Sequence, residues 1–67
     1  MSKFVISANV RKFRQKRGLS QDRLSKLADL SLNTVVKVES GKNPNPTIQT
    51  LAKIARSLQV KVDDLIT

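Results

Sequence analysis

The chain has no cysteine and no histidine among its 67 residues. Their absence excludes disulfides, thiol nucleophiles, zinc fingers and imidazole acid–base chemistry, so we expect no metal, no cofactor and no enzymatic activity. Phe4 and Phe13 are the only aromatic residues, whereas proteins that bind single strands usually stack bases on several rings. The longest apolar run, 4–6, cannot span a membrane, and no signal peptide is visible, so we expect a cytoplasmic protein.

The charge of the chain is strongly one-sided. Thirteen basic residues face five acidic ones, which gives a net charge of +8. Residues 1–42 hold ten of the basic and three of the acidic residues, in a chain long enough for one small domain, 1–67. A run of charge is usually a solvated helix face, but an imbalance this extensive favours a surface that binds a polyanion.

Apolar residues recur at helical spacing and never alternate as in a half-buried strand, which predicts an all-α fold. Helices are expected over 6–17, 21–28 and 32–40 and from 48 onward, with a short helical turn over 62–66. Ser20, Ser31 and Thr47 can cap the helices that follow them, and Gly18 and Gly41 can end those that precede them. The residues expected to face inward are Ile6, Val10, Phe13, Leu24, Leu27, Ala28, Val35, Val38, Ile48, Leu51, Ile54, Ala55 and Leu58.

The segment 21–40 holds two helices joined by about three residues, a spacing that suits a helix-turn-helix better than an antiparallel hairpin. At about 100° per residue, the second helix turns Val35 and Val38 inward. The opposite stripe faces outward and holds Asn33, Val36, Lys37 and Ser40, with Leu32 and Thr34 beside it.

The outward side of this helix has the chemistry to read base pairs in the major groove of DNA. Asparagine pairs with adenine and lysine with guanine, and Leu32 or Val36 can pack on a thymine methyl group. On an isolated helix, Asn33 and Lys37 would simply be solvated surface residues. Placed after a short turn in a basic domain, they favour DNA binding.

Glu39, the only glutamate, falls on the inward side of its helix, and Arg14 lies beside the apolar stripe of the first helix. Because a charge directed inward needs a partner, we predict an Arg14–Glu39 ion pair that orients the two helices. The alternative is that both side chains extend to water.

Many residues follow the pattern of one known family: 18–21, Leu24, Leu27, Ala28, Ser31, Thr34, Val35, 38–42, Pro46, Thr47, Thr50, Leu51, Ile54, Ala55, Leu58, Val60, Asp64 and Leu65. Taken together, they resemble the phage-repressor and Cro-type (XRE-like) helix-turn-helix family. The resemblance implies a compact, lambda-repressor-like bundle of five helices that binds double-stranded DNA and regulates transcription, commonly as a homodimer on a palindromic operator. No small-molecule effector is evident.

The resemblance also implies roles for individual residues. Combined with the outward stripe, it puts Leu32, Asn33, Val36 and Lys37 at the bases. The residues expected at the DNA backbone are Arg11, Gln21, Thr34, Ser40, Lys42 and Asn43. Gln21 would also brace the recognition helix 32–40, and Arg14 and Glu39 match the internal ion pair of the family.

Three residues depart from the family pattern. Asp29 stands where glycine is usual in the turn, and aspartate tolerates the left-handed conformation better than most residues. Ser25 brings a hydroxyl where alanine is usual, and Lys61 stands at the cap of the last helix, where serine or threonine is commoner. None of these changes removes the motif.

Three questions stay open at the level of sequence. Residues 1–5 are either a DNA-reaching arm or a frayed end. The main functional alternative is a basic adaptor or antitoxin-like module that binds a protein or RNA partner. The apolar residues near the C-terminal end form either a homodimer interface or part of the core: Leu58, Val60, Val62, Leu65 and Ile66.

Overall fold

The computed structural model describes residues 5–67 and contains five α-helices, with no strand in that range. Their bounds are Val5–Lys16 (α1), Gln21–Ala28 (α2), Leu32–Ser40 (α3), Ile48–Leu58 (α4) and Val62–Ile66 (α5). The all-α prediction is confirmed, and α1 lies one residue earlier than expected. Val5 belongs to α1 and not to an arm, and the rest of the expected arm, 1–4, lies outside the described residues.

The predicted caps explain why α2, α3 and α4 begin where they do. Ser20, Ser31 and Thr47 each precede a helix in an extended conformation. Each hydroxyl accepts a hydrogen bond from the backbone N–H three residues later, at 3.0 to 3.1 Å. The first N–H groups of a helix have no partner within it, so these bonds stabilise the predicted borders.

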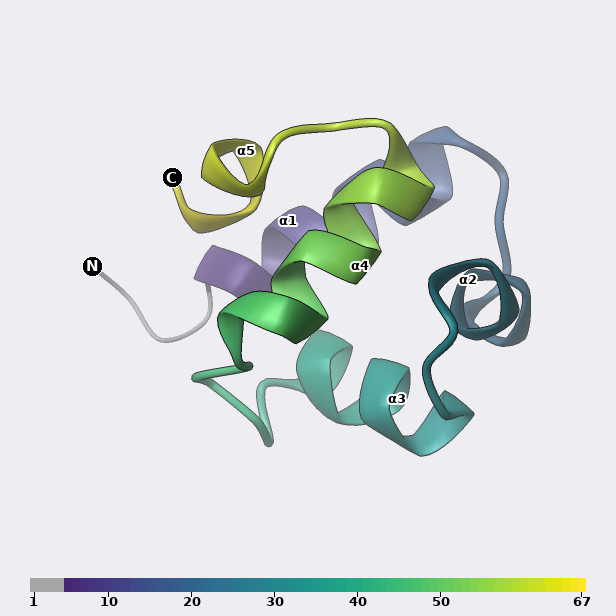
Figure 1. Ribbon diagram of the computed structural model, residues 1–67, viewed down its shortest axis with the longest axis horizontal. Coiled ribbons are helices and arrows are strands. Elements are labelled where there is room, and N and C mark those ends of the chain that lie inside the picture. Colours follow the sequence, from purple (N-terminus) through teal and green to yellow (C-terminus); the bar gives the residue numbers. More distant parts are fainter. Residues whose placement is uncertain (1–4) are drawn as a thin grey trace.

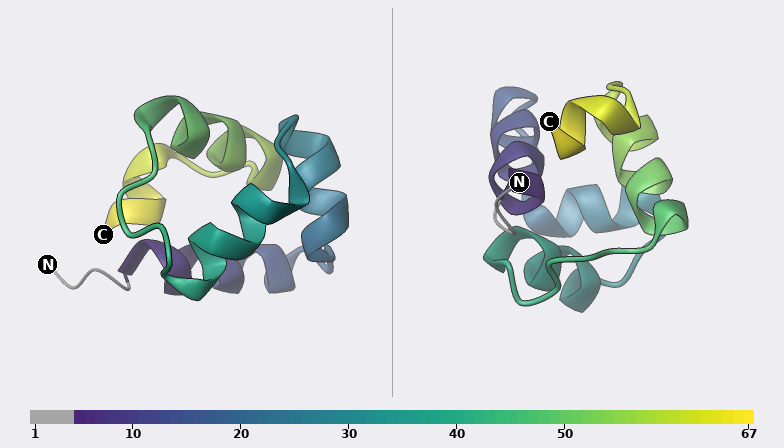
Figure 2. Two further views of the ribbon diagram at one scale, coloured as in Figure 1. Left: turned by 90° about the horizontal axis from the view of Figure 1, so that it is seen from below. Right: turned by 90° about the vertical axis from the view of Figure 1, so that its left-hand side faces the viewer.

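The helices surround a single core (Figure 1). In the right-hand view of Figure 2, α1 and α4 stand on either side, α5 closes the bundle at the top and α3 closes it at the bottom. Every helix contributes to the core, whose buried residues are Val10, Leu24, Val35, Val38, Leu51, Ile54, Ala55, Leu58 and Leu65. From α3, only Val35 and Val38 belong to this core, so the helix packs on the bundle with one side.

The helices are too short to be stable in isolation. The longest, α1, has 12 residues, and single helices of that length are marginal in water, so packing between helices must hold the fold. None of the helices within 5–67 is long and apolar enough to cross a membrane.

Two residues expected inward are exposed. Leu27 is 48% and Ile48 is 70% exposed. On α2, the buried arc runs through Leu24, Ser25 and Ala28, which leaves Leu27 at its edge. Ile48 lies at helical spacing from the buried Leu51 and Ala55, but it is the first residue of α4 and is not covered by the core. Helical periodicity sets the direction of a side chain and not how far the neighbouring helices extend.

The C-terminal end also corrects an expectation. Leu58 and Leu65 are 1% and 0% exposed, so they complete the core and cannot form a dimer interface in this fold. They are buried because α5 packs against α1 and α4. Val60, Val62 and Ile66 also pack on the core but are only half-buried, and they keep part of their apolar surface outside.

Candidate nucleic-acid interface

The turn between α2 and α3 consists of Asp29, Leu30 and Ser31. Asp29 has φ 56° and ψ 46°, the left-handed conformation. The Leu30 N–H donates to the carbonyl of Ser25 at 2.9 Å, which ends α2 and redirects the chain. The expectation that Asp29 takes this conformation is confirmed, and α2 and α3 form a helix-turn-helix.

Helix α3 presents two different faces. Val35 and Val38 are buried in the core, as predicted. On the opposite side, Asn33, Val36, Lys37 and Ser40 are exposed, as predicted, and Leu32 is exposed beside them. From here on, the outward stripe of α3 means the four proposed base-reading residues, Leu32, Asn33, Val36 and Lys37. The two apolar members, Leu32 and Val36, are 44% and 38% exposed. The stripe therefore offers an amide, an ammonium group and two aliphatic side chains on one surface.

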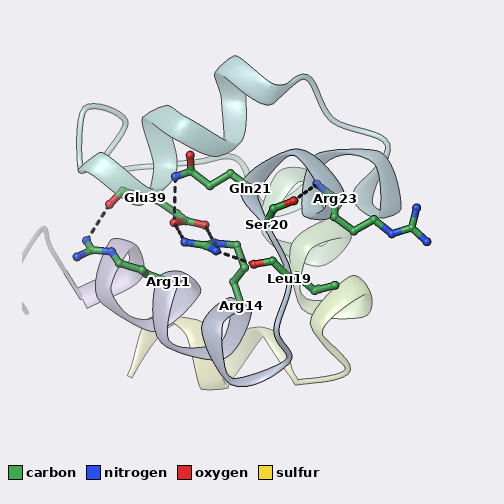
Figure 3. A network of polar contacts seen from close by, with 7 residues as sticks. All are labelled: Arg11, Arg14, Leu19, Ser20, Gln21, Arg23 and Glu39. Carbon is green, nitrogen blue, oxygen red and sulfur yellow. Dashed lines mark hydrogen bonds and ion pairs between the residues drawn. The ribbon is translucent and has the colours of Figure 1, made fainter.

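Glu39 fixes the orientation of α3 (Figure 3). Its side chain is 3% exposed, and Arg14 donates to it twice, from Nε to Oε2 at 2.6 Å and from Nη2 to Oε1 at 3.0 Å. The predicted ion pair is thus present. Gln21 donates from Nε2 to Oε1 at 3.2 Å, so the expected bracing of α3 by α2 is present as well.

Arg14 and Arg11 extend this network along α1. Arg14 Nη1 donates to the carbonyl of Leu19 at 2.6 Å, which holds the segment before α2. Arg11 Nη2 donates to the backbone carbonyl of Glu39 at 2.9 Å, near the C-terminal end of α3. Glu39 thus ties α3 to both α1 and α2.

The sequence did not predict the contact between Arg11 and α3. It led us to expect Arg11 at the DNA backbone. The spacing of Arg11 and Arg14 carried a signal, because residues three apart lie on the same face of a helix. A guanidinium group has five N–H donors, and the structure gives Arg11 one bond, from Nη2. The rest of this exposed side chain faces solvent.

The residues after α3 continue its outer surface. The Asn43 N–H donates to the carbonyl of Lys37 at 3.2 Å, and the Lys42 N–H to the hydroxyl of Ser40 at 3.3 Å. Lys42 is exposed and Asn43 is half-buried. On the first turn of α3, Thr34 is half-buried and shares a 2.8 Å hydrogen bond with the Ser31 hydroxyl. These bonds hold the expected backbone-contacting residues beside the outward stripe.

The electrostatics of this side suit a polyanion. Helix α3 and the loop 41–47 carry Lys37 and Lys42, and their one carboxylate, Glu39, is buried and paired. Helix α5, which carries the adjacent residues Asp63 and Asp64, lies on the opposite side of the bundle from α3 (Figure 1). An exposed α-helix fits the major groove of B-DNA, and the surrounding cations can pair with phosphates.

Comparisons with known proteins agree with this geometry. The helix-turn-helix family model (HTH_3) matches residues 10–65. An uncharacterized HTH-type transcriptional regulator of Archaeoglobus fulgidus is 38% identical over 60 residues, which cover 90% of this chain and 84% of that protein. The control protein C.SmaI of Serratia marcescens is 34% identical over 65 residues, 97% of this chain and 76% of that protein.

A solved structure extends the similarity to three dimensions. The restriction-modification controller protein C.AhdI from Aeromonas hydrophila matches with a TM-score of 0.88 and 28% identity, over 94% of each chain. The predicted five-helix bundle is therefore confirmed as the fold of such regulators. With a family match over nearly the whole chain and relatives of similar length, this protein belongs to the XRE-type helix-turn-helix family of DNA-binding transcriptional regulators.

Proposed function

We propose that this protein represses or activates transcription by binding one specific duplex sequence, with α3 in the major groove and Leu32, Asn33, Val36 and Lys37 at the bases. One observation carries the proposal: the outward stripe of α3 is exposed while Glu39, on the same helix, is locked to α1 and α2. A rigid reading surface favours specificity because its side chains meet the base edges in one register.

Contacts to phosphates would set the position of the protein on the duplex. Such contacts position a protein, whereas contacts to base edges specify the sequence. We assign this role to residues around the outward stripe: Arg11, Gln21, Thr34, Ser40, Lys42 and Asn43. Arg11 and Gln21 would each act twice, with one donor on Glu39 and another on a phosphate.

The operator is proposed to be a two-fold symmetric site read by a homodimer. A symmetric dimer of this class places its two recognition helices about 34–36 Å apart, one turn of DNA. The half-exposed apolar residues Val60, Val62 and Ile66 supply the dimer surface. The similarity to C.SmaI and C.AhdI favours a control protein of the restriction–modification kind. This proposal includes the cytoplasmic location expected from the sequence.

Selection of binding sites from random duplex DNA tests the proposal. We expect a single sequence with inverted symmetry and half-site centres about one helical turn apart. Lys37→Ala should relax the preference at one base position, at a cost of roughly 1–3 kcal/mol. Lys42→Ala is the matched control, because loss of a phosphate contact should weaken binding to all sequences alike and reduce the salt slope by about one.

Two outcomes would contradict the proposal. If the selection enriched no sequence, the protein would not bind DNA sequence-specifically. If Asn33→Ala and Lys37→Ala both left the sequence preference unchanged, α3 would not be the element that reads the bases.

A further inference from the structure

The outward stripe of α3 is divided into two parallel rows. Asn33 and Lys37 lie four residues apart and form a polar row, and Leu32 and Val36 form an apolar row beside it with the same spacing. Residues at this spacing are neighbours on a helix surface. The two aliphatic side chains therefore make one continuous apolar strip, and both are exposed.

The fold does not account for the apolar row. Helix α3 contributes Val35 and Val38 to the core, and Leu32 and Val36 are not part of it. Valine is also a poorer helix former than the long polar residues that usually occupy an exposed position. Exposed apolar residues that occur singly need no explanation, but these two adjoin each other on the face that carries Asn33 and Lys37.

The major groove offers one apolar group to such a strip. That group is the C5 methyl of thymine, which cytosine lacks unless it is methylated at the same carbon. The surroundings favour a nucleic acid over an apolar protein partner. Helix α3 and the loop 41–47 carry the exposed Lys37 and Lys42, and the one carboxylate of this segment, Glu39, is buried and paired.

We infer that Leu32 and Val36 make this protein a reader of C5 methyl groups, so that thymine, or 5-methylcytosine in its place, is recognised beside the bases that Asn33 and Lys37 contact. The inference rests on the proposed function. Four residues of helix rise about 6 Å, against about 3.4 Å for each base pair, so the methyl groups should lie on adjacent or next-nearest base pairs.

Removal of single methyl groups from the selected operator tests this inference. Each thymine of a half-site is replaced in turn by deoxyuridine, which removes the methyl group and leaves the pairing edge unchanged. Burial of one methyl group corresponds to about a fourfold change in affinity, so we expect about a fourfold loss at one or two positions. At the same positions, 5-methylcytosine should bind about fourfold better than cytosine.

Protein variants assign the effect to the apolar row. The variants Leu32→Ala and Val36→Ala should each bind the deoxyuridine and thymine operators equally well when the exchange is at the position that the removed side chain contacts. Leu27→Ala is the matched control, since Leu27 is similarly exposed but lies on α2, and it should keep the full effect of the methyl group.

The outcomes separate the two claims. Sequence-specific binding that is indifferent to uridine at every thymine would overturn the inference and leave the proposed function intact. A methyl effect that persists unchanged in both alanine variants would also overturn it. Absence of any sequence-specific binding would overturn the proposed function and the inference with it.

Discussion

Glu39 is the residue on which the orientation of the recognition helix depends. Its carboxylate accepts hydrogen bonds from Arg14 and Gln21, and its backbone carbonyl accepts one from Arg11. A buried ion pair adds little net stability compared with apolar side chains of the same size, but loss of one partner leaves an uncompensated charge. The network therefore contributes orientation more than stability.

Removal of the charge on Glu39 should be costly in a domain this small. We expect Glu39→Gln to lower the free energy of unfolding by about 3 kcal/mol, since Arg14 would keep its charge without a counter-ion. For a chain of this length, that is a large part of a total of roughly 3–10 kcal/mol. Urea denaturation followed by circular dichroism measures the change.

Two further variants separate charge from packing. The double variant Arg14→Met with Glu39→Leu should recover most of the lost stability but bind the operator more weakly, because α3 loses its polar tether. Lys26→Ala breaks the exposed pair with Asp22 and should change stability by less than about 0.5 kcal/mol. Equal stability of Glu39→Gln and the unchanged protein would refute the structural role of the pair.

The turn between α2 and α3 decides where the outward stripe points. The single left-handed residue Asp29 accomplishes the change of direction. Aspartate and asparagine tolerate this conformation, glycine adopts it freely and β-branched residues resist it. The family pattern with glycine and the aspartate found here are thus two solutions to one backbone requirement.

Substitutions of Asp29 should follow backbone preference and not side-chain chemistry. We expect Asp29→Gly and Asp29→Asn to keep stability within about 0.5 kcal/mol, and Asp29→Val to lower it by at least about 1 kcal/mol. Thermal unfolding of the three variants measures the order. A valine variant as stable as the asparagine variant would show that the turn accommodates another geometry.

In the molecule as a whole, the proposed DNA-binding face and the proposed dimer surface lie on different sides. Helix α3 and α5 lie at opposite ends of the bundle (Figure 2). A second copy packed on the half-exposed apolar residues Val60, Val62 and Ile66 would therefore leave α3 uncovered. Dimerisation through this side would leave both outward stripes free.

The proposed dimer can be broken without loss of the fold. We expect sedimentation of the unchanged protein to show a mass that rises with concentration, and Ile66→Asp to stay monomeric because a buried, unpaired carboxylate opposes association. Circular dichroism must show that the variant is folded. Leu27→Ser, on α2, should dimerise normally. A strictly monomeric unchanged protein, even on operator DNA, would exclude this assembly.

The features that depend on local backbone chemistry were predictable from the sequence. The starts of α2, α3 and α4 follow from hydroxyl caps three residues from their donors. The inward and outward sides of α3 follow from helical periodicity, and the left-handed turn follows from the tolerance of Asp29. Each of these interactions spans four residues or fewer, so no knowledge of the packing is needed.

How far each surface is covered, and which distant groups meet, depends instead on how the helices pack. The tertiary structure buried Leu58 and Leu65, exposed Leu27 and Ile48, and directed Arg11 to a carbonyl 28 residues away. These outcomes depend on where one helix ends against another, which periodicity does not contain. The Arg14–Glu39 pair was predictable because an inward charge must find a counter-ion, but its extension to Gln21 and Arg11 required the docked helices.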